Sequence, residues 1–276
     1  MSEIVISGLS KSFSTGSGRR KQQLRAVNDV SLAVPQGSCT ALVGESGSGK
    51  TTVARIIVGL ESADAGSVSI GGNPIGTRPT RSERRRRAKL VQMVFQDPQG
   101  SLNRRLPARV AVDEVLRAHF SLSAAERKAL CAQLFEQVGL TPVHLSALPS
   151  ELSGGQRQRV AIARALAAEP SVLVLDEAVA ALDVSVQAKV LDLLSELQQQ
   201  KRLTYLFITH DLAVVRQLAD SVAVMRRGRI VEAGRTDDVL DRPEHPYTQL
   251  LKDSVPRRGW KPETGRMLTL NKELDS

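Results

Sequence analysis

A glycine-rich segment near residue 45 has the composition of a phosphate-binding loop. Residues 44–51 read Gly-Glu-Ser-Gly-Ser-Gly-Lys-Thr and fit the pattern GxxxxGK[ST]. Glycines let backbone N–H groups wrap a phosphate, and the N-terminus of a following helix adds partial positive charge. Lys50 can then reach the β- and γ-phosphates of a nucleotide, while the Thr51 hydroxyl can bind Mg²⁺. The nucleotide-binding residues predicted here are Gly44, Glu45, Ser46, Gly47, Ser48, Gly49, Lys50, Thr51 and Thr52.

The segments on both sides of this loop fit the same prediction. An apolar run at 40–43 reads as a strand leading in, and 52–58 reads as a helix leading out. A flexible Gly/Ser loop before a helix is the alternative, but it does not account for strand and helix both being in register.

Two adjacent acids end a second apolar run. Residues 172–175 are Val-Leu-Val-Leu and are followed by Asp176 and Glu177. A buried strand would deliver Asp176 to the carboxyl edge of a parallel sheet, where ligands bind in open α/β sheets. Asp176 would orient Mg²⁺ through its water shell, and Glu177 would polarise the attacking water as general base. Two acids that merely end a strand in solvent are the alternative, which the neighbouring phosphate loop disfavours.

Short β-type runs alternate with helical patterns along the chain, which predicts an α/β fold with a largely parallel core. Residues 184–200 show the clearest helix, with Val186, Val190, Leu193 and Leu197 on one stripe. Between about 98 and 150 the pattern is helical only, with helices expected at 110–120 and 124–138. The expected strands are 4–7, 32–34, 40–43, 68–70, 91–95, 172–175, 205–209, 222–225 and 229–231. Residues 242–246 should break regular structure before a polar tail.

Composition excludes several classes of protein. The 276 residues are 41% hydrophobic and 24% charged, ordinary values for a globular chain. No apolar run approaches the ~20 residues of a membrane span, and no apolar signal segment follows Glu3. Cys39 and Cys131 are too few and too far apart for a disulfide framework, so we expect a reducing compartment.

Positive charge is concentrated in one window. Residues 78–109 hold ten basic and two acidic residues, whereas the whole chain carries +9. Aromatic residues are only 3% and none interleaves with these arginines, so stacked nucleic-acid bases are poorly supported. An anionic lipid surface or a plain solvated helix remains open for this basic window.

The string Leu152-Ser153-Gly154-Gly155-Gln156 resembles the LSGGQ signature of ATP-binding cassette (ABC) ATPases. Other motifs of that family follow its order over about residues 3–251. Gln96 resembles the Q-loop residue, Asp183 in Ala-Leu-Asp the D-loop, and His210 the switch histidine. Phe13 stands where the family places an aromatic ring against adenine.

The resemblance implies a fold and a cofactor set. It implies a P-loop NTPase (RecA-like) core with an antiparallel β subdomain and an inserted α-helical subdomain. We expect the ATPase domain at 1–241, the helical insertion at about 98–160, and a C-terminal extension of the peptide/nickel importer type at 242–276. ATP and Mg²⁺ would be the cofactors, with Thr51, Gln96 and Asp176 at the metal and Glu177, His210 and Gln96 in catalysis.

The same resemblance implies that one chain holds only part of each site. In the family two cassettes pack head to tail, and each ATP lies between the P-loop of one and the signature of the other. Ser153 and the helix beginning near Gly154 would face the partner's γ-phosphate. Residues assigned to that shared side are Ser153, Gly154, Gly155, Gln156 and Asp183. Ala178 stands where most members have proline, which would loosen the loop after Glu177. Ala180 replaces the usual D-loop serine and its hydroxyl, so hydrolysis at the site containing Ala180 is expected to be slower.

Three strings resemble ATPases of dipeptide, oligopeptide and nickel importers: 95–103, 181–188 and 245–251. This implies an ATPase subunit lying peripherally at the cytoplasmic face of the inner membrane. Its partners would be a second ABC ATPase subunit, two permease subunits and, indirectly, an extracytoplasmic solute-binding protein, with no nucleic acid. A cytoplasmic helix of the permease would dock on the helical insertion. The solute stays open, since it is selected by other subunits.

Two other functions fit the sequence less well. A soluble ABC ATPase acting on nucleic acid or ribosomes usually has two cassettes or a long coiled-coil insertion, and this chain has one cassette. A P-loop GTPase needs an Asn-Lys-x-Asp motif, whereas residues 271–274 read Asn-Lys-Glu-Leu.

Overall fold

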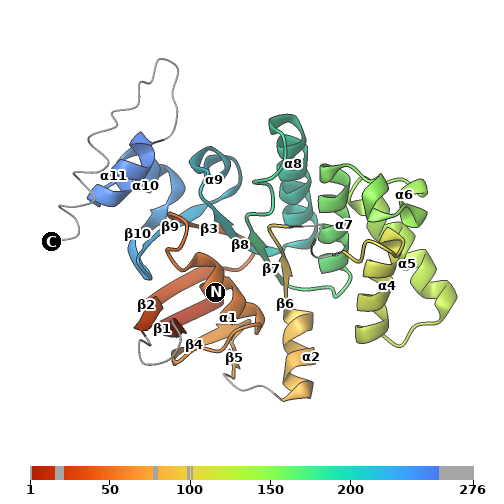
Figure 1. The fold of residues 1–276 in the computed structure, drawn as a ribbon, viewed down its shortest axis with the longest axis horizontal. Helices are drawn as coiled ribbons and strands as arrows, with labels where there is room; N and C mark the ends of the chain where they lie inside the picture. Colours follow the sequence, from red (N-terminus) through yellow and green to blue (C-terminus); the bar gives the residue numbers. More distant parts are fainter. Residues whose placement is uncertain (1, 16–21, 77–79, 98–99, 101, 255–276) are drawn as a thin grey trace.

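A computed structural model describes residues 2–15, 22–76, 80–97, 100 and 102–254. Within them the chain forms an antiparallel sheet, a largely parallel sheet and a group of helices set to one side (Figure 1). Residues 16–20, a Gly-, Ser- and Arg-rich stretch that predicts a loop, lie outside the described residues.

The parallel sheet has the strand order β10-β9-β3-β8-β7-β6. Its strands are β3 (Cys39–Val43), β6 (Val91–Val94), β7 (Val172–Asp176), β8 (Thr204–Thr209), β9 (Ser221–Arg226) and β10 (Arg229–Arg235). Neighbours from β9 to β6 pair in parallel, and only β10 is antiparallel to β9. This confirms the predicted α/β core.

The central strands β3, β7 and β8 are buried on both faces, which explains their nearly continuous apolar sequences. Leu173 and Leu175 of β7 face one cluster of buried side chains, whereas Val172 and Val174 face another. The first cluster includes residues of α7 (Gly154–Leu166), α8 (Val184–Lys201) and α9 (Leu212–Leu218). The second includes α1 (Lys50–Val58) and the antiparallel sheet. The sheet therefore holds helices at fixed positions along its carboxyl edge.

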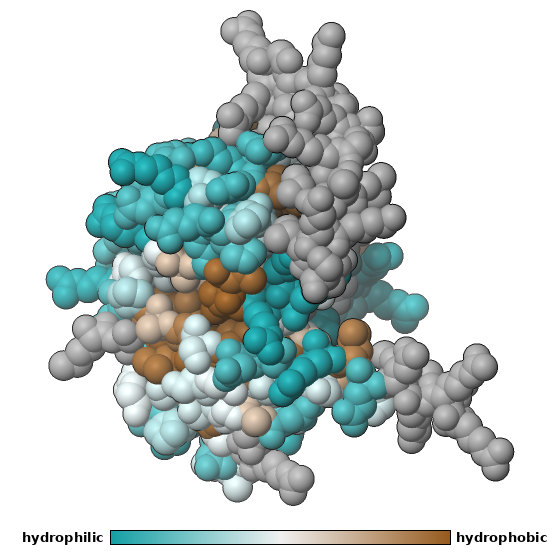
Figure 2. Space-filling view, turned by 90° about the vertical axis from the view of Figure 1, so that its left-hand side faces the viewer, coloured by the Kyte–Doolittle hydropathy of each residue, from teal (hydrophilic) through white to brown (hydrophobic). Residues whose placement is uncertain are grey.

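The antiparallel sheet has the order β2-β1-β4-β5. Its strands are β1 (Ser2–Thr15), β2 (Gln22–Pro35), β4 (Ala65–Ile70) and β5 (Asn73–Ile75). The sequence predicted only short pieces of β1 and β2, because three register shifts after Ile4/Val34 interrupt the alternation of apolar residues. Figure 2 views the side of the molecule that carries this sheet and β10, and hydrophobic residues gather at its centre. Leu24 of β2 is 58% exposed.

The helical group is built from α4 (Ala108–His119), α5 (Ala124–Gln137), the single turn α6 (Val143–Ser146), a 3₁₀ turn (Pro149–Glu151) and α7. The helices predicted at 110–120 and 124–138 are confirmed. Part of the basic window forms α2 (Arg81–Leu90), which projects from the body beside β6 (Figure 1).

The C-terminal part differs from the prediction. Residues 242–245 break regular structure as predicted, but Pro246 already begins α11 (Pro246–Asp253), where a polar tail was expected. A short helix, α10 (Thr236–Asp241), precedes the break. The short apolar stripe of α11, with Tyr247 fully buried, was hidden among polar residues. The division at residue 241 stays a prediction. No helix among the described residues is long and apolar enough to span a bilayer.

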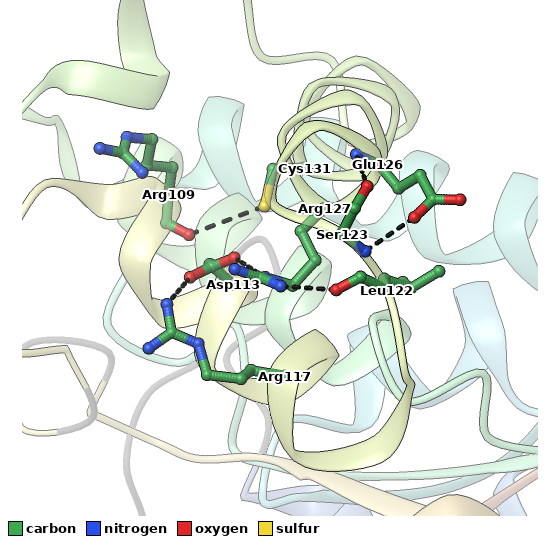
Figure 3. A network of polar contacts seen from close by, with 8 residues as sticks. All are labelled: Arg109, Asp113, Arg117, Leu122, Ser123, Glu126, Arg127 and Cys131. Carbon is green, nitrogen blue, oxygen red and sulfur yellow. Dashed lines mark hydrogen bonds and ion pairs between the residues drawn. The ribbon is translucent and has the colours of Figure 1, made fainter.

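An ionic network joins α4 to α5 (Figure 3). Asp113 accepts from Arg127 Nε and from Arg117 Nη2, both at 2.7 Å. The Asp113 and Arg127 side chains are only 16% and 17% exposed, whereas Arg117 is 67% exposed. Burial by itself would raise the pKa of Asp113, but the bonds from the two arginines outweigh it and the pKa lies below its usual value.

We predict that Asp113→Asn lowers the free energy of unfolding by about 1–2 kcal/mol at pH 7, because Arg127 loses a charge-assisted partner. Since the folded-state pKa of Asp113 is lowered, its stabilisation is present above the unfolded pKa of about 4 and is lost as pH falls through the folded value. Chemical denaturation at pH 7 and pH 3 would measure this. Asp192→Asn, an exposed change on α8, is the control; equal losses in both variants would contradict the prediction.

Candidate nucleotide-binding site

The phosphate loop lies between β3 and α1, tightly packed against its neighbours. Gly44 has φ +150°, and a Cβ atom there would lie 2.0 Å from the Met225 carbonyl oxygen. Gly49 has φ +107°, and its Cβ would lie 2.2 Å from the Ala26 carbonyl oxygen. Glycine is therefore required at both ends of the loop, because any side chain would collide with backbone.

Lys50 is buried at the start of α1, only 5% exposed. Its Nζ donates to the Gly44 and Glu45 carbonyl oxygens at 2.7 and 2.8 Å, and more weakly to Ser48 Oγ at 3.3 Å. Burial lowers the pKa of Lys50, while the charges of Glu177, Asp176 and Glu45 act in the opposite direction. The ammonium group is thus enclosed by oxygen atoms that a polyphosphate can replace.

The predicted metal residues Thr51 and Asp176 lie together. Thr51 Oγ1 donates to Asp176 Oδ1 at 3.2 Å across the loop. Asp176 is 5% exposed, and burial raises its pKa although the Thr51 bond and nearby cations oppose the shift. Among the described residues, no cluster of three or more His, Cys, Asp or Glu side chains could hold a metal by itself. Two protein oxygens fit Mg²⁺, which keeps waters and takes phosphate oxygens as further ligands.

Three predicted catalytic residues meet at the same edge of the sheet. Gln96 Nε2 donates to Glu177 Oε2 at 2.7 Å, and His210 Nδ1 lies 3.4 Å from Glu177 Oε1. Glu177 has a left-handed φ of +46°, and its N–H donates to the Ile208 carbonyl at 2.9 Å. This fixes a carboxylate between an amide and an imidazole, an arrangement able to hold and deprotonate a water molecule.

The signature residues lie apart from this cluster. Ser153 is exposed and caps α7, its Oγ accepting from the Gln156 N–H at 3.2 Å. Gly155 packs so closely on α8 that a Cβ would lie 2.3 Å from Val186 Cγ1. Asp183 caps α8 by accepting from the Val186 N–H at 3.0 Å. In the described part of the chain, no hydrogen bond of Ser153–Gln156 reaches residues 44–52.

Phe13 is half-buried on β1, opposite Leu24 of β2, and lies outside the Glu177 cluster. The ammonium group of Lys11 lies 5.3 Å from its ring centre. No hydrogen bond or ring contact between Phe13 and the phosphate loop occurs among the described residues, so the structure adds nothing to its predicted contact with adenine.

One residue at the loop was missed by the sequence analysis. The Glu45 N–H donates to the hydroxyl oxygen of Tyr247, on α11, at 3.0 Å. In the sequence alone, the string at 245–251 indicates only the branch of dipeptide, oligopeptide and nickel importers. An aromatic residue within an otherwise polar stretch was the available signal, but its partner lies 202 residues away.

A lysine-bearing phosphate loop, a carboxylate pair at the edge of a parallel sheet and a capped Ser-Gly-Gly helix on an inserted helical group define a P-loop ATPase of the cassette type. The chain belongs to the ABC transporter family, which matches residues 27–180. A second family, the C-terminal region of oligopeptide/dipeptide transporters, matches residues 231–273. The protein is thus an ABC ATPase in the oligopeptide/dipeptide branch.

Individual relatives agree with this assignment. The chain is 44% identical to the oligopeptide transport ATP-binding protein OppF of Streptococcus mutans, over 92% of this chain and 81% of that one. It is 48% identical to a putative peptide import ATP-binding protein of Brucella abortus, over 85% and 70% of the two chains.

Solved structures share the fold. The dimeric cassette MJ0796 bound to ADP and phosphate superposes with a TM-score of 0.76 at 27% identity, covering 84% of this chain and 98% of that one. CbiO1 of Clostridium perfringens, part of the transporter complex cbiONQ, gives a TM-score of 0.76 at 27% identity over 88% and 92%.

We predict that Lys50→Ala weakens ATP binding by about ten- to a hundredfold, because charge-assisted hydrogen bonds to the phosphates are lost. Equilibrium titration of the purified chain with a fluorescent ATP analogue measures the affinity. Lys128→Ala on the exposed face of α5 is the control. Equal affinities in the two variants would remove Lys50 from the site.

Proposed function

We propose that this chain is the ATP-hydrolysing subunit that powers an importer of oligopeptides through separate permease subunits. The contact of Glu177 with both Gln96 and His210, beside the loop that holds Lys50, carries the proposal. The peptide-transport relatives support oligopeptides as the solute class. Nickel, which the sequence left open, receives no specific support from them.

The residues divide the work at the site. Residues 44–52, Lys50 among them, bind the phosphates, while Thr51, Asp176 and Gln96 would hold Mg²⁺, whose charge would offset that of the phosphates. Glu177 takes a proton from the attacking water as general base. His210 stabilises the charge that develops on the transferred phosphoryl group. Phe13 contacts adenine.

Two cassettes complete each site. Ser153 and Asp183 are exposed, and among the described residues no negatively charged group accepts a hydrogen bond from the N–H groups at the start of α7. A helix N-terminus of this kind is an anion site, so the γ-phosphate of a partner's ATP satisfies it. The dimeric structure of a similar cassette supports this arrangement. Ala178 and Ala180 lie beside Glu177, and we propose that they slow hydrolysis at the site they adjoin.

We propose that a groove beside Gln96 is the docking site for a cytoplasmic helix of the permease. It has a volume of about 320 Å³ and lies between β6, α2, α4 and α7. Phe95 and Leu60, which are 37% and 62% exposed, line it together with Val115. The apolar face of an amphipathic helix fits the apolar residues of this groove, which Glu114, His119 and Arg164 also line. Phe95 precedes Gln96, so motion of the permease would be transmitted directly to Glu177. The chain would then lie at the cytoplasmic face of the inner membrane, with a solute-binding protein acting on the far side.

The domain division follows the same proposal. We assign 1–241 to the ATPase domain, about 98–160 to its helical insertion, and 242–276 to the extension typical of this branch. A soluble ABC ATPase acting on nucleic acid gains no support from the relatives reported above.

We predict that Glu177→Gln binds ATP as tightly as wild type but hydrolyses it about a hundredfold more slowly or worse, because an amide cannot accept the proton of water. The variant should accumulate as an ATP-bound dimer. Phosphate release and size-exclusion chromatography with ATP measure both effects. Glu136→Gln, an exposed change on α5, is the control; normal turnover in Glu177→Gln would exclude Glu177 as the base.

The basic window gives a separate prediction about the membrane. Arg87 is buried and donates to the Ile56 carbonyl at 2.9 Å, and Arg85 donates to the Ala118 carbonyl, so neither tests lipid binding cleanly. Arg84 and Arg86 are exposed. If α2 lies at an anionic leaflet, each charge contributes up to about 1 kcal/mol.

We therefore predict that neutralising Arg84 and Arg86 to Gln weakens binding to anionic liposomes about tenfold, with little change on neutral ones. Cosedimentation measures the binding. Replacing exposed Lys128 and Lys201 by Gln removes the same charge elsewhere. If the arginine variant lost no affinity for anionic liposomes, or no more than the lysine variant, α2 would be a plain solvated helix.

A further inference from the structure

One peptide unit at the start of the phosphate loop is held from both sides. The carbonyl oxygen of Gly44 accepts from Lys50 Nζ at 2.7 Å. The N–H of the same peptide, which belongs to Glu45, donates to the hydroxyl of Tyr247 at 3.0 Å. The partner of the carbonyl oxygen is the Lys50 ammonium group, which a bound nucleotide would attract to its phosphates. The partner on the other side is a buried phenol on α11.

Tyr247 is itself rigidly fixed. Its side chain is completely buried, and the guanidinium of Arg226, at the end of β9, lies 5.0 Å from its ring centre. Burial raises the pKa of Tyr247, although its bond with Glu45 opposes the shift, so the hydroxyl stays neutral at physiological pH. A neutral, immobile oxygen is a suitable acceptor for a single backbone N–H.

The start of α11 is clamped to the parallel sheet. Glu232 of β10 accepts from the N–H groups of Glu244 and His245 at 2.9 and 3.2 Å. His245 Nδ1 then caps the helix by accepting from the Tyr247 N–H at 3.1 Å. These bonds set the position of the Tyr247 ring relative to β9, which runs beside β3 and the phosphate loop.

Nucleotide binding removes one of the two restraints on the peptide. When Lys50 turns to the phosphates, the Gly44 carbonyl loses this donor, and the Tyr247 bond remains as a restraint on the orientation of that peptide. Rotation of this peptide would break the Tyr247 bond and redirect the chain where it enters the phosphate loop. The N–H groups of the loop would then be less well aimed at the phosphates, which would weaken phosphate binding.

We propose that Tyr247 is a positioning residue for the nucleotide site: its hydroxyl keeps the Gly44–Glu45 peptide oriented, so that helix α11 of the C-terminal extension supports the phosphate loop. The proposal rests on the assignment of residues 44–52 as the ATP site.

The test removes one oxygen atom from each of the two tyrosines of the chain. Tyr247→Phe keeps the ring and its packing but leaves the Glu45 N–H without its acceptor. Tyr205→Phe is the matched control, because Tyr205 is also fully buried and its hydroxyl donates to a backbone carbonyl, that of Leu194, at 2.9 Å in the core. Lys50→Ala and wild type are measured beside them as full-length chains.

For Tyr247→Phe we expect a rise of about two- to tenfold in both the Kd for ATP and the KM for hydrolysis, the effect of one neutral hydrogen bond. The kcat at saturating ATP should stay within twofold of wild type. Tyr205→Phe should keep the wild-type Kd and KM. Its melting temperature should fall by as much as that of Tyr247→Phe, or by more. Exchange of the Glu45 amide proton, followed by NMR in the wild-type chain without nucleotide, should be slow, which requires no variant to fold.

Each other outcome has a distinct meaning. If Lys50→Ala lost ATP binding but Tyr247→Phe bound ATP like wild type, Tyr247 would be a packing residue only and the proposal would be wrong. Equal losses of affinity in both tyrosine variants, or fast exchange of the Glu45 amide, would also overturn it. If Lys50→Ala kept wild-type affinity, the ATP-site assignment itself would fail.

Discussion

The enclosure of the Lys50 ammonium group at the carboxyl edge of a parallel sheet is the constraint on which the site depends. A buried cation is costly unless oxygen atoms surround it, and here two carbonyl oxygens and a hydroxyl do so at 2.7 to 3.3 Å. Asp176 and Glu177 supply compensating negative charge from the end of β7. A nucleotide brings its own oxygens, so the same lysine changes partners rather than losing them. The glycines at 44 and 49 exist because the loop must bend this tightly against the backbones of β9 and β2.

The second feature of the molecule is the separation of its two anion-binding ends. The phosphate loop and the start of α7 are both helix N-termini, yet no hydrogen bond connects them in the described part of the chain. Residue 155 must be glycine because α7 packs directly on Val186, and this places the exposed Ser153 beside the D-loop. A chain built this way presents one anion site for its own nucleotide and one for another molecule, which explains why similar cassettes are found as dimers.

Residues 244–247, at the start of α11, contact the half of the molecule that carries the phosphate loop. Three residues from this half contact the segment 244–247. They are Glu232 of β10, Arg226 at the end of β9, and Glu45 of the phosphate loop. The helices α10 and α11 pack together beside the same edge of the sheet (Figure 1). The region that marks the oligopeptide/dipeptide branch is therefore in direct contact with the loop that marks every P-loop ATPase.

The sequence by itself determined the chemistry and the core. Residues that act through local backbone geometry, such as 44–51, can be predicted from their spacing. Strands buried on both faces can be predicted from continuous apolar runs such as 172–175. Asp176, Glu177, Gln96 and His210 were predicted from their motifs, and the tertiary structure only gave their distances. Tertiary structure alone decided that β1 and β2 extend through bulges, that Arg87 of the basic window is buried on α1, and that Tyr247 reaches Glu45. These features depend on contacts between segments that are distant in the sequence. The periodicity and spacing of residues within one segment do not predict which backbone group of the other segment it will contact.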